Sequence, residues 1–267
     1  MCARVGSNGH RVYVARRFAM PVVTNSFGQP VGPPLAGWTP RPVPAREPMD
    51  GRLCRLEPLE ASRHARLLFD AYRADPEGRN WTYLPYGPFA TADEYANAVQ
   101  VIQSLDHTIP FAIVDRASER PVGVAAWLRI EPAMGTIEVG HLSYSPAMQR
   151  RPIATEAMYL MMKRVFDDLG YRRYEWKCDS ANAPSLAAAQ RLGFRFEGVF
   201  RQHMVVKGRS RDTAWLSILD SQWPALRTAL ESWLADGNFD GKGLQSRSLS
   251  SFITDARGAA GSEALRP

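Results

Sequence analysis

The residues from Gln149 to Glu156 join a strand-like segment to a long amphipathic one, and they include two adjacent arginines. A helix that starts directly after such a loop leaves backbone N–H groups unpaired at its positive end. Phosphate and other anions bind at this kind of helix start, and Arg150 and Arg151 add positive charge to it. The residue types leave two interpretations open, an anion-binding loop and an ordinary helix start.

The other residues that bind metals or attack carbonyl carbons are scattered along the chain. The five histidines form no pair at helical spacing, so we expect no metal site. Cys2, Cys54 and Cys178 form no closely spaced pair, which argues against a disulfide framework and favours a cytoplasmic protein. Cys178 ends a strand with no histidine near it in sequence, and we interpret it as a packing residue rather than a nucleophile.

Alternating strand and helix patterns begin at Gly51 and must position these groups. Short connections between the strands at 110–116, 121–130 and 136–144 predict antiparallel neighbours. The helix expected over 152–169 is a crossover, so the strands on either side of it should be parallel, with ligands at their carboxyl ends near 145–155. We further predict helices at 58–72, 91–105, 182–192 and 223–234, and strands at 51–59, 172–179, 196–207 and 212–220.

These elements predict an α/β (mixed α+β) fold, with helices on both faces of a central mixed, mostly antiparallel sheet. Residues 1–50 hold eight of the twenty prolines, and we expect a basic, Pro-rich arm that is partly extended or disordered. Residues 51–235 should form the folded domain and residues 236–267 a flexible tail. Met20 is a candidate for the true start of the chain.

The net charge of +6 does not indicate a nucleic-acid-binding protein. Residues 1–50 carry a charge of +4, from six arginines, Glu47 and Asp50, so most of the excess lies outside the folded domain. No run of five basic residues occurs, and we expect no nucleic-acid partner. The longest uncharged stretch, 21–40, is interrupted by five prolines and three glycines, so we also expect no membrane span.

Two motifs resemble the GNAT acetyltransferase superfamily. Residues 149–154 occupy the frame Gln/Arg-x-x-Gly-x-Gly/Ala of its acetyl-CoA pyrophosphate loop, with Pro152 in place of the first glycine. Residues 182–194 are similar to its Asn-x-x-[Ala/Ser]…Leu-Gly-Phe helix, and Phe196-Glu197-Gly198 continues as the family does. The resemblance spans about residues 51–220 and is closest to the RimJ/RimL type, which acetylates ribosomal-protein N-termini.

The resemblance implies a three-layer GNAT-like fold and transfer of an acetyl group from acetyl-CoA to a primary amine, by direct attack in a ternary complex. The acceptor would be a protein N-terminal amine or a small molecule, and a homodimer is left open. A non-catalytic acyl-CoA-binding module is the alternative, because Pro152 removes one N–H donor from the loop. The implied cofactor-binding residues are Gln149, Arg150, Arg151, Pro152, Ile153, Ala154, Thr155 and Asn182.

The amine must lose a proton, and the strand at 136–144 supplies candidate bases. The resemblance implies Glu138 as a base or a water-positioning residue, with a salt-bridged sheet carboxylate as the alternative. His141 and His203 have side chains that titrate near neutral pH, although strand histidines more often pack. A bulge at Gly140 would part this strand from its parallel neighbour and expose N–H groups to the thioester oxygen.

The resemblance also implies an acid for the leaving thiolate and a pocket for the amine. Many family members carry a tyrosine as the acid where this chain has Ala189, and Ser185 is the substitute one helical turn earlier, unless it merely caps the helix. The acceptor-binding loop of the family falls on an aromatic stretch of this chain, whose rings would line the amine pocket or cover the core. Those residues are Trp81, Tyr83 and Tyr86.

Overall fold

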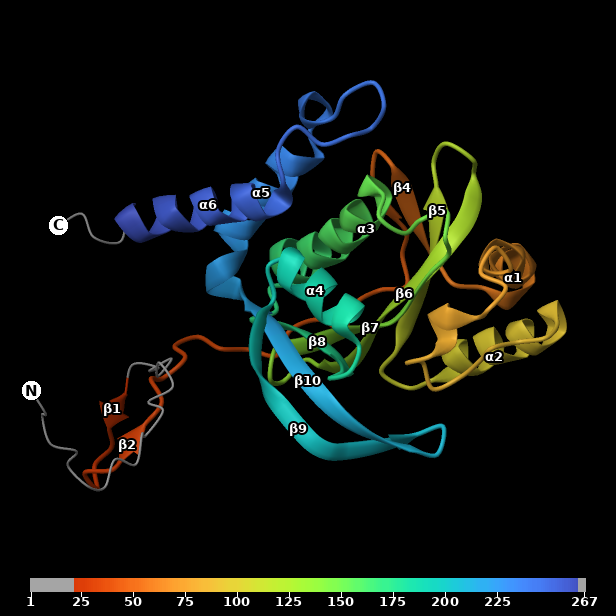
Figure 1. Cartoon of the computed structure of the whole chain (residues 1–267). Helices are drawn as coiled ribbons and strands as arrows, with labels where there is room; N and C mark the ends of the chain where they lie inside the picture. The colour runs from red at the N-terminus through yellow and green to blue at the C-terminus, as the bar shows by residue number, and fades with distance from the viewer. Residues whose placement is uncertain (1–21, 264–267) are drawn as a thin grey trace, which may run out of the picture. The chain divides into compact units, whose positions relative to one another are not determined.

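The computed structural model describes residues 22–263, and their side chains as far as residue 258 (Figure 1). The chain divides into two compact units, Met1–Thr39 and Pro40–Pro267. In the first unit, strand β1 (Val23–Thr24) pairs antiparallel with β2 (Pro30–Val31) across a turn. The candidate start at Met20 lies outside the described residues.

The second unit contains an eight-stranded sheet with the order β3-β4-β5-β6-β7-β8-β10-β9. All neighbours in this sheet are antiparallel except β7 and β8, which confirms the predicted mixed, mostly antiparallel sheet. The strands are β3 (Met49–Asp50), β4 (Cys54–Pro58), β5 (Ile109–Asp115), β6 (Arg120–Glu131), β7 (Thr136–Tyr144), β8 (Arg173–Asp179), β9 (Arg195–Val206) and β10 (Arg209–Leu219).

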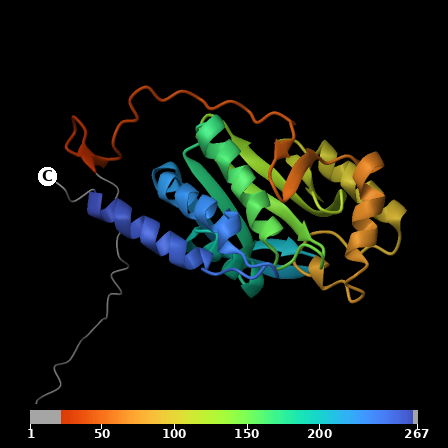
Figure 2. The same ribbon diagram turned by 90° about the horizontal axis from the view of Figure 1, so that it is seen from above.

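Helices cover both faces of this sheet, as Figure 2 shows for α1 and α2 on one side and α3 on the other. Alternate residues of β5 enter two separate cores: Ala112 packs with Leu68 of α1 and Val99 of α2, whereas Phe111 and Ile113 join the core that contains α3. The helices are α1 (Arg66–Tyr72), α2 (Ala92–Ser104), α3 (Pro152–Lys163), α4 (Ala183–Arg191), α5 (Trp223–Leu234) and α6 (Leu249–Glu263).

Short helical turns extend or connect these helices. Two π-helical turns, Ala61–Ala65 before α1 and Arg164–Asp168 after α3, lengthen their helices, and 3₁₀ turns occupy Arg79–Trp81, Asp220–Gln222 and Asp236–Asn238. The first predicted helix, expected to start at Pro58, begins three residues later at Ala61, because Pro58 still belongs to β4.

The structure differs from the predicted arm and tail at both boundaries of the folded domain. Residues 40–50 belong to the second unit, where Met49 is buried and pairs with Leu56 of β4. After α5, the Asn238 side chain binds backbone groups of Trp233 and Arg247, and α6 then buries Leu249 in the main core. Local composition suggested flexibility, but a few apolar residues suffice to dock these segments.

A buried carboxylate ties α3 to the turn between β3 and β4. Glu156 accepts hydrogen bonds from the backbone N–H groups of Arg52, Leu53 and Cys54 at 3.0, 2.6 and 2.8 Å. A Cβ atom on Gly51 would lie 2.6 Å from the Glu156 Oε2 atom, so glycine leaves the room that this contact requires. Glu156 thereby fixes the position of the helix whose first turn follows the predicted anion-binding loop.

Candidate active site

The neighbouring strands β7 and β8 separate beside a bulge. Parallel pairing joins β7 to β8 over four residue pairs and ends at Val139 and Trp176, which confirms the predicted parallel neighbours. On the other side of β7, Gly140 pairs with Ala126 and Ser143 with Val124, so β7 carries one extra residue between them. The bulge was predicted at Gly140 itself. It falls on the next residues instead, and His141 takes the left-handed conformation at φ 49°.

His141 contacts Tyr86 at this bulge. Tyr86 belongs to residues 81–89, which we call the aromatic loop. The two rings stack at 5.8 Å with an interplanar angle of 10°, and the Tyr86 hydroxyl lies 3.1 Å from the His141 Nδ1 atom. Burial lowers the pKa of His141 below its usual value, and the positive charge of Arg129 lowers it further. His141 is therefore an uncharged imidazole at neutral pH, the form in which histidine accepts a proton.

Glu138 lies in a buried network of ion pairs. Its carboxylate is 3% exposed and its Oε2 atom lies 2.7 Å from Arg129 Nη1 and 2.8 Å from Lys177 Nζ. The Lys177 ammonium also pairs with Glu175 at 2.8 Å and lies 3.7 Å from the ring centroid of Trp215. Both cations already contact the Oε2 atom, so this geometry favours the salt-bridged alternative for Glu138.

Replacing Glu138 with glutamine should lower the free energy of unfolding by about 3 kcal/mol, because it removes one partner of a buried ion pair. We expect turnover to fall less than tenfold. Urea unfolding and steady-state kinetics measure the two effects, and Glu60→Gln, which removes an exposed pair with Arg63, should cost about 0.5 kcal/mol or less. A hundredfold loss of turnover at unchanged stability would instead identify Glu138 as the base.

Ser185 lies in the first turn of α4 and contacts Trp176 of β8. The indole N–H of Trp176 donates to the Ser185 hydroxyl oxygen at 3.0 Å, and the Ser185 hydroxyl also forms a side-chain hydrogen bond with Cys178. Asn182, rather than Ser185, caps α4, because its side chain accepts from the Ser185 N–H at 3.1 Å. Burial raises the pKa of the neighbouring Cys178 thiol, consistent with a packing role.

In the predicted anion-binding loop, the Arg150 side chain is exposed, whereas the side chains of Gln149 and Arg151 bind nearby backbone carbonyls. Gln149 donates to the Tyr144 carbonyl and Arg151 to the Ala147 carbonyl, so both side chains fold back on the loop. Arg150 is exposed in the left-handed conformation at φ 59° and makes no hydrogen bond or ion pair with the described residues. The Thr155 hydroxyl accepts from Arg191 of α4 at 2.9 Å and is buried.

Pro152 is the first residue of α3, and Arg151 before it has extended backbone. Proline suits this position because the first helical N–H has no partner within the helix. The buried Ser145 hydroxyl, at the start of the same loop, has no partner among the described residues. Arg150 and the N-terminal turn of α3 therefore form the part of the loop that is open to an anion.

The three aromatic residues predicted for the amine pocket have three different environments. Tyr86 faces the bulge, whereas Trp81 is buried in the core formed with α1 and α2. The Tyr83 hydroxyl donates to the Ala181 carbonyl at 3.1 Å, and Lys207 at the end of β9 donates to the Trp81 carbonyl at 2.8 Å. The aromatic loop is thus tied to elements on the far side of the parted strands.

His203 takes no part in this arrangement. It lies on β9, where its Nδ1 atom is 3.0 Å from the Thr213 hydroxyl and its ring packs against Phe200 and Trp215. We interpret it as a packing histidine.

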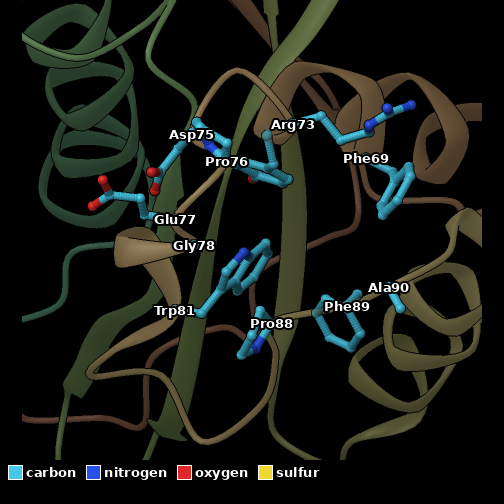
Figure 3. A pocket seen from close by; sticks show the side chains of 11 residues that line it. Phe69, Arg73, Asp75, Pro76, Glu77, Gly78, Trp81, Pro88, Phe89 and Ala90 are labelled. Carbon is cyan, nitrogen blue, oxygen red and sulfur yellow. The ribbon is translucent and has the colours of Figure 1, made fainter.

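A cavity of about 390 Å³ opens beside the aromatic loop, between α1 and residues 75–90 (Figure 3). Trp81 and Phe89 supply aromatic walls. Asp75 accepts the backbone N–H of Asn80, and Glu77 pairs with Arg79. The figure shows both acidic side chains directed away from the Trp81 ring. This cavity lies apart from the loop at 149–155 and offers no chemistry of its own.

Several residues that shape the site had no motif in the sequence. Arg129 and Lys177 neutralise Glu138, and Trp176 fixes Ser185. The alternation of Arg173, Glu175 and Lys177 along one strand was the signal that could have revealed the ion pairs. Within the described part of the chain, no cluster of three or more His, Cys, Asp or Glu residues could hold a metal, and no helix is long and apolar enough to cross a membrane.

Comparison with known proteins identifies the class that this fold and site define. The family described as "Acetyltransferase (GNAT) domain" matches residues 53–195. A GCN5-related N-acetyltransferase from Brucella melitensis is 50% identical, with a TM-score of 0.81 over 82% of this chain and 100% of that one. The uncharacterized N-acetyltransferase p20 of Bacillus licheniformis is 25% identical over 57% of this chain and 85% of its own length.

The chain belongs to the GNAT acetyltransferase family and is an acetyl-CoA-dependent acetyltransferase. Its structural neighbours include a ribosomal-protein-S5-alanine acetyltransferase from Vibrio fischeri. That protein is 17% identical, with a TM-score of 0.53 over 66% of this chain and 98% of that one. At this identity the likeness shows the fold alone. The family match over residues 53–195 confirms the predicted resemblance to the GNAT superfamily.

Proposed function

We propose that this chain acetylates a primary amine at the place where β7 and β8 part, with the N-terminal amine of a protein as the acceptor. The observation that carries the proposal is the bulge that presents His141 beside these strands. An uncharged histidine at the end of the parallel pairing meets the main chemical requirement, since the attacking amine must lose a proton.

The residues around the loop fit the diphosphate of acetyl-CoA. Arg150 supplies an unpaired positive charge, and the first turn of α3 supplies backbone N–H groups at its positive end. Pro152 reduces the number of N–H donors by one. Gln149, Arg151 and Thr155 would support the loop rather than touch the diphosphate, because their side chains already have protein partners.

Acetyl-CoA supplies the thioester carbonyl that the amine attacks. His141 accepts the proton that the amine loses as the new C–N bond forms. CoA leaves as a thiolate when the C–S bond breaks, the Ser185 hydroxyl donates a hydrogen bond to that sulfur without giving up its proton, and Trp176 holds the hydroxyl in place. Backbone N–H groups freed by the bulge would stabilise the negative oxygen of the intermediate stage.

The resemblance of the sequence motifs to the RimJ/RimL type supports a protein N-terminal amine as the acceptor, and a small-molecule amine is the second candidate. A peptide with a free N-terminus should release CoA thiol from acetyl-CoA, whereas the same peptide with an acetylated N-terminus should not. If only small amines react, the acceptor part of the proposal is wrong.

Calorimetric titration tests the cofactor site independently of the acceptor. We expect acetyl-CoA to bind with a micromolar Kd, about −8 kcal/mol. Dephospho-CoA keeps the diphosphate and should also bind. No detectable binding of either ligand would mean that the loss of an N–H at Pro152 has disabled the loop, and would favour a protein that does not turn over acetyl-CoA.

A further inference from the structure

Tyr86 makes two geometrically defined contacts with the proposed base. Its hydroxyl oxygen is 3.1 Å from His141 Nδ1, and its ring lies nearly parallel to the imidazole. Tyr86 belongs to the aromatic loop, fifty-five residues from His141 in sequence, so the contact depends on how the loop docks. The loop is itself held by the tilted packing of Tyr86 on Trp81 at 6.2 Å.

This contact occupies one of the two ring nitrogens. A neutral imidazole carries one proton, and the nitrogen without it is the one that acts as a base. Since Tyr86 covers Nδ1, an incoming amine can reach only Nε2. Nε2 can accept a proton only if the ring proton is on Nδ1, where it would be donated to the Tyr86 oxygen.

We propose that Tyr86 is a positioning residue that holds His141 in the tautomer protonated at Nδ1, so that Nε2 is presented to the acceptor amine as the base. This inference rests on the proposed function. When Nε2 takes the proton from the amine, the Nδ1–H bond to the tyrosine oxygen persists and strengthens, because the donor has become a cation. Burial keeps the Tyr86 phenol protonated by raising its pKa, so the oxygen that accepts this bond is neutral.

The charged and titratable groups around the pair come from three elements. Arg129 of β6 lies near His141, but its charge is shared with Glu138 of β7. Tyr72 of α1 lies near Tyr86 and donates its own hydroxyl to the Ser143 carbonyl at 3.0 Å. None of these groups is an anion facing the imidazole. The Tyr86 oxygen is thus the acceptor that the described structure provides for an Nδ1–H.

Nitrogen-15 NMR of the imidazole reads the tautomer directly, without any assay of activity. In the full-length protein at pH 8, the Nδ1 signal of His141 should be that of a protonated nitrogen and the Nε2 signal that of an unprotonated one. The reverse assignment would overturn the inference, because Tyr86 would then be donating to Nδ1 and Nε2 would carry the proton.

Tyr86→Phe keeps the stacked ring and removes only the hydroxyl. We expect mixed tautomers by NMR and a fall in kcat/KM of about tenfold, smaller than the loss caused by a wrong tautomer in a charged catalytic triad. The acid side of the pH profile should move to lower pH, since the imidazolium loses an acceptor. Tyr171→Phe removes another buried hydroxyl, which donates to the Pro42 carbonyl, and should leave the tautomer and kcat/KM unchanged.

These measurements separate the inference from the proposed function. If Tyr86→Phe leaves both the tautomer and the pH profile unchanged, Tyr86 only packs and the inference is wrong, whatever the role of His141. If instead His141 proves dispensable for turnover, the proposed base is wrong even when the NMR assignment agrees.

Discussion

Replacing His141 with asparagine should lower kcat/KM by about 10²- to 10³-fold, the range associated with loss of a general base, while the Kd for acetyl-CoA changes less than twofold. Asparagine is the suitable replacement because it tolerates the left-handed backbone at φ 49° better than other residues. The variant therefore removes the titrating nitrogen and retains the bulge. Steady-state kinetics with a free-N-terminus peptide and calorimetry with acetyl-CoA measure the two quantities.

The pH dependence of the unmodified protein gives a second check on His141. The base acts only when unprotonated, so activity should be lost as pH falls through the pKa of His141. Because burial and Arg129 lower this pKa below 6.5, the enzyme should keep its histidine active at pH 6.5. The asparagine variant should lose this acid limb. Full activity in that variant, with an unchanged pH profile, would exclude His141 as the base.

Replacing Glu156 with glutamine should lower the free energy of unfolding by about 4 kcal/mol. The carboxylate accepts three backbone N–H groups from the turn between β3 and β4, and hydrogen bonds to a charged acceptor contribute about 1.5–3 kcal/mol each. An amide keeps one acceptor oxygen, which can still serve the N–H groups of Leu53 and Cys54, but it turns its NH2 donor toward the N–H of Arg52. The Arg52 N–H would then lose its acceptor, and the two remaining hydrogen bonds would lose their charged acceptor.

Urea unfolding followed by circular dichroism measures this loss. The matched control is Glu77→Gln, whose carboxylate is exposed and pairs only with Arg79, and its effect should stay within about 0.5 kcal/mol. An equal, small effect for both substitutions would show that the Glu156 contacts do not hold α3 to the edge strands.

The order of strands and helices followed from the sequence because periodicity is a local property. The helix at 223–234 was found where it was predicted. The parallel pairing of β7 and β8 was predictable as well, since a crossover helix separates them. Gly140 indicated the bulge but not the residue with positive φ, because a glycine marks where a strand can bend without determining which neighbour adopts the turn.

The roles of single side chains were harder to predict because their partners are distant in sequence. The sequence predicted Glu138 as a candidate base. In the structure its carboxylate forms ion pairs with Arg129 and Lys177, which lie on the two neighbouring strands. Thr155 was assigned to the loop, but Arg191 of α4 binds its hydroxyl. A motif defines which residues lie near a ligand, whereas the register between strands and the docking of helices decide which of them are already engaged.

The short parallel pairing of β7 and β8 has a consequence for self-association. Among the described residues, the pairing of these strands ends at Val139 and Trp176. Beyond this point, the backbone groups on the β8 side of β7 have no partner strand. On the outside of a protein, such an unpaired row is a template for aggregation. Here it lies in the middle of an eight-stranded sheet, where neighbouring strands restrict access. The molecule can therefore keep backbone groups available to a slender ligand without presenting an open sheet edge to a strand of another molecule.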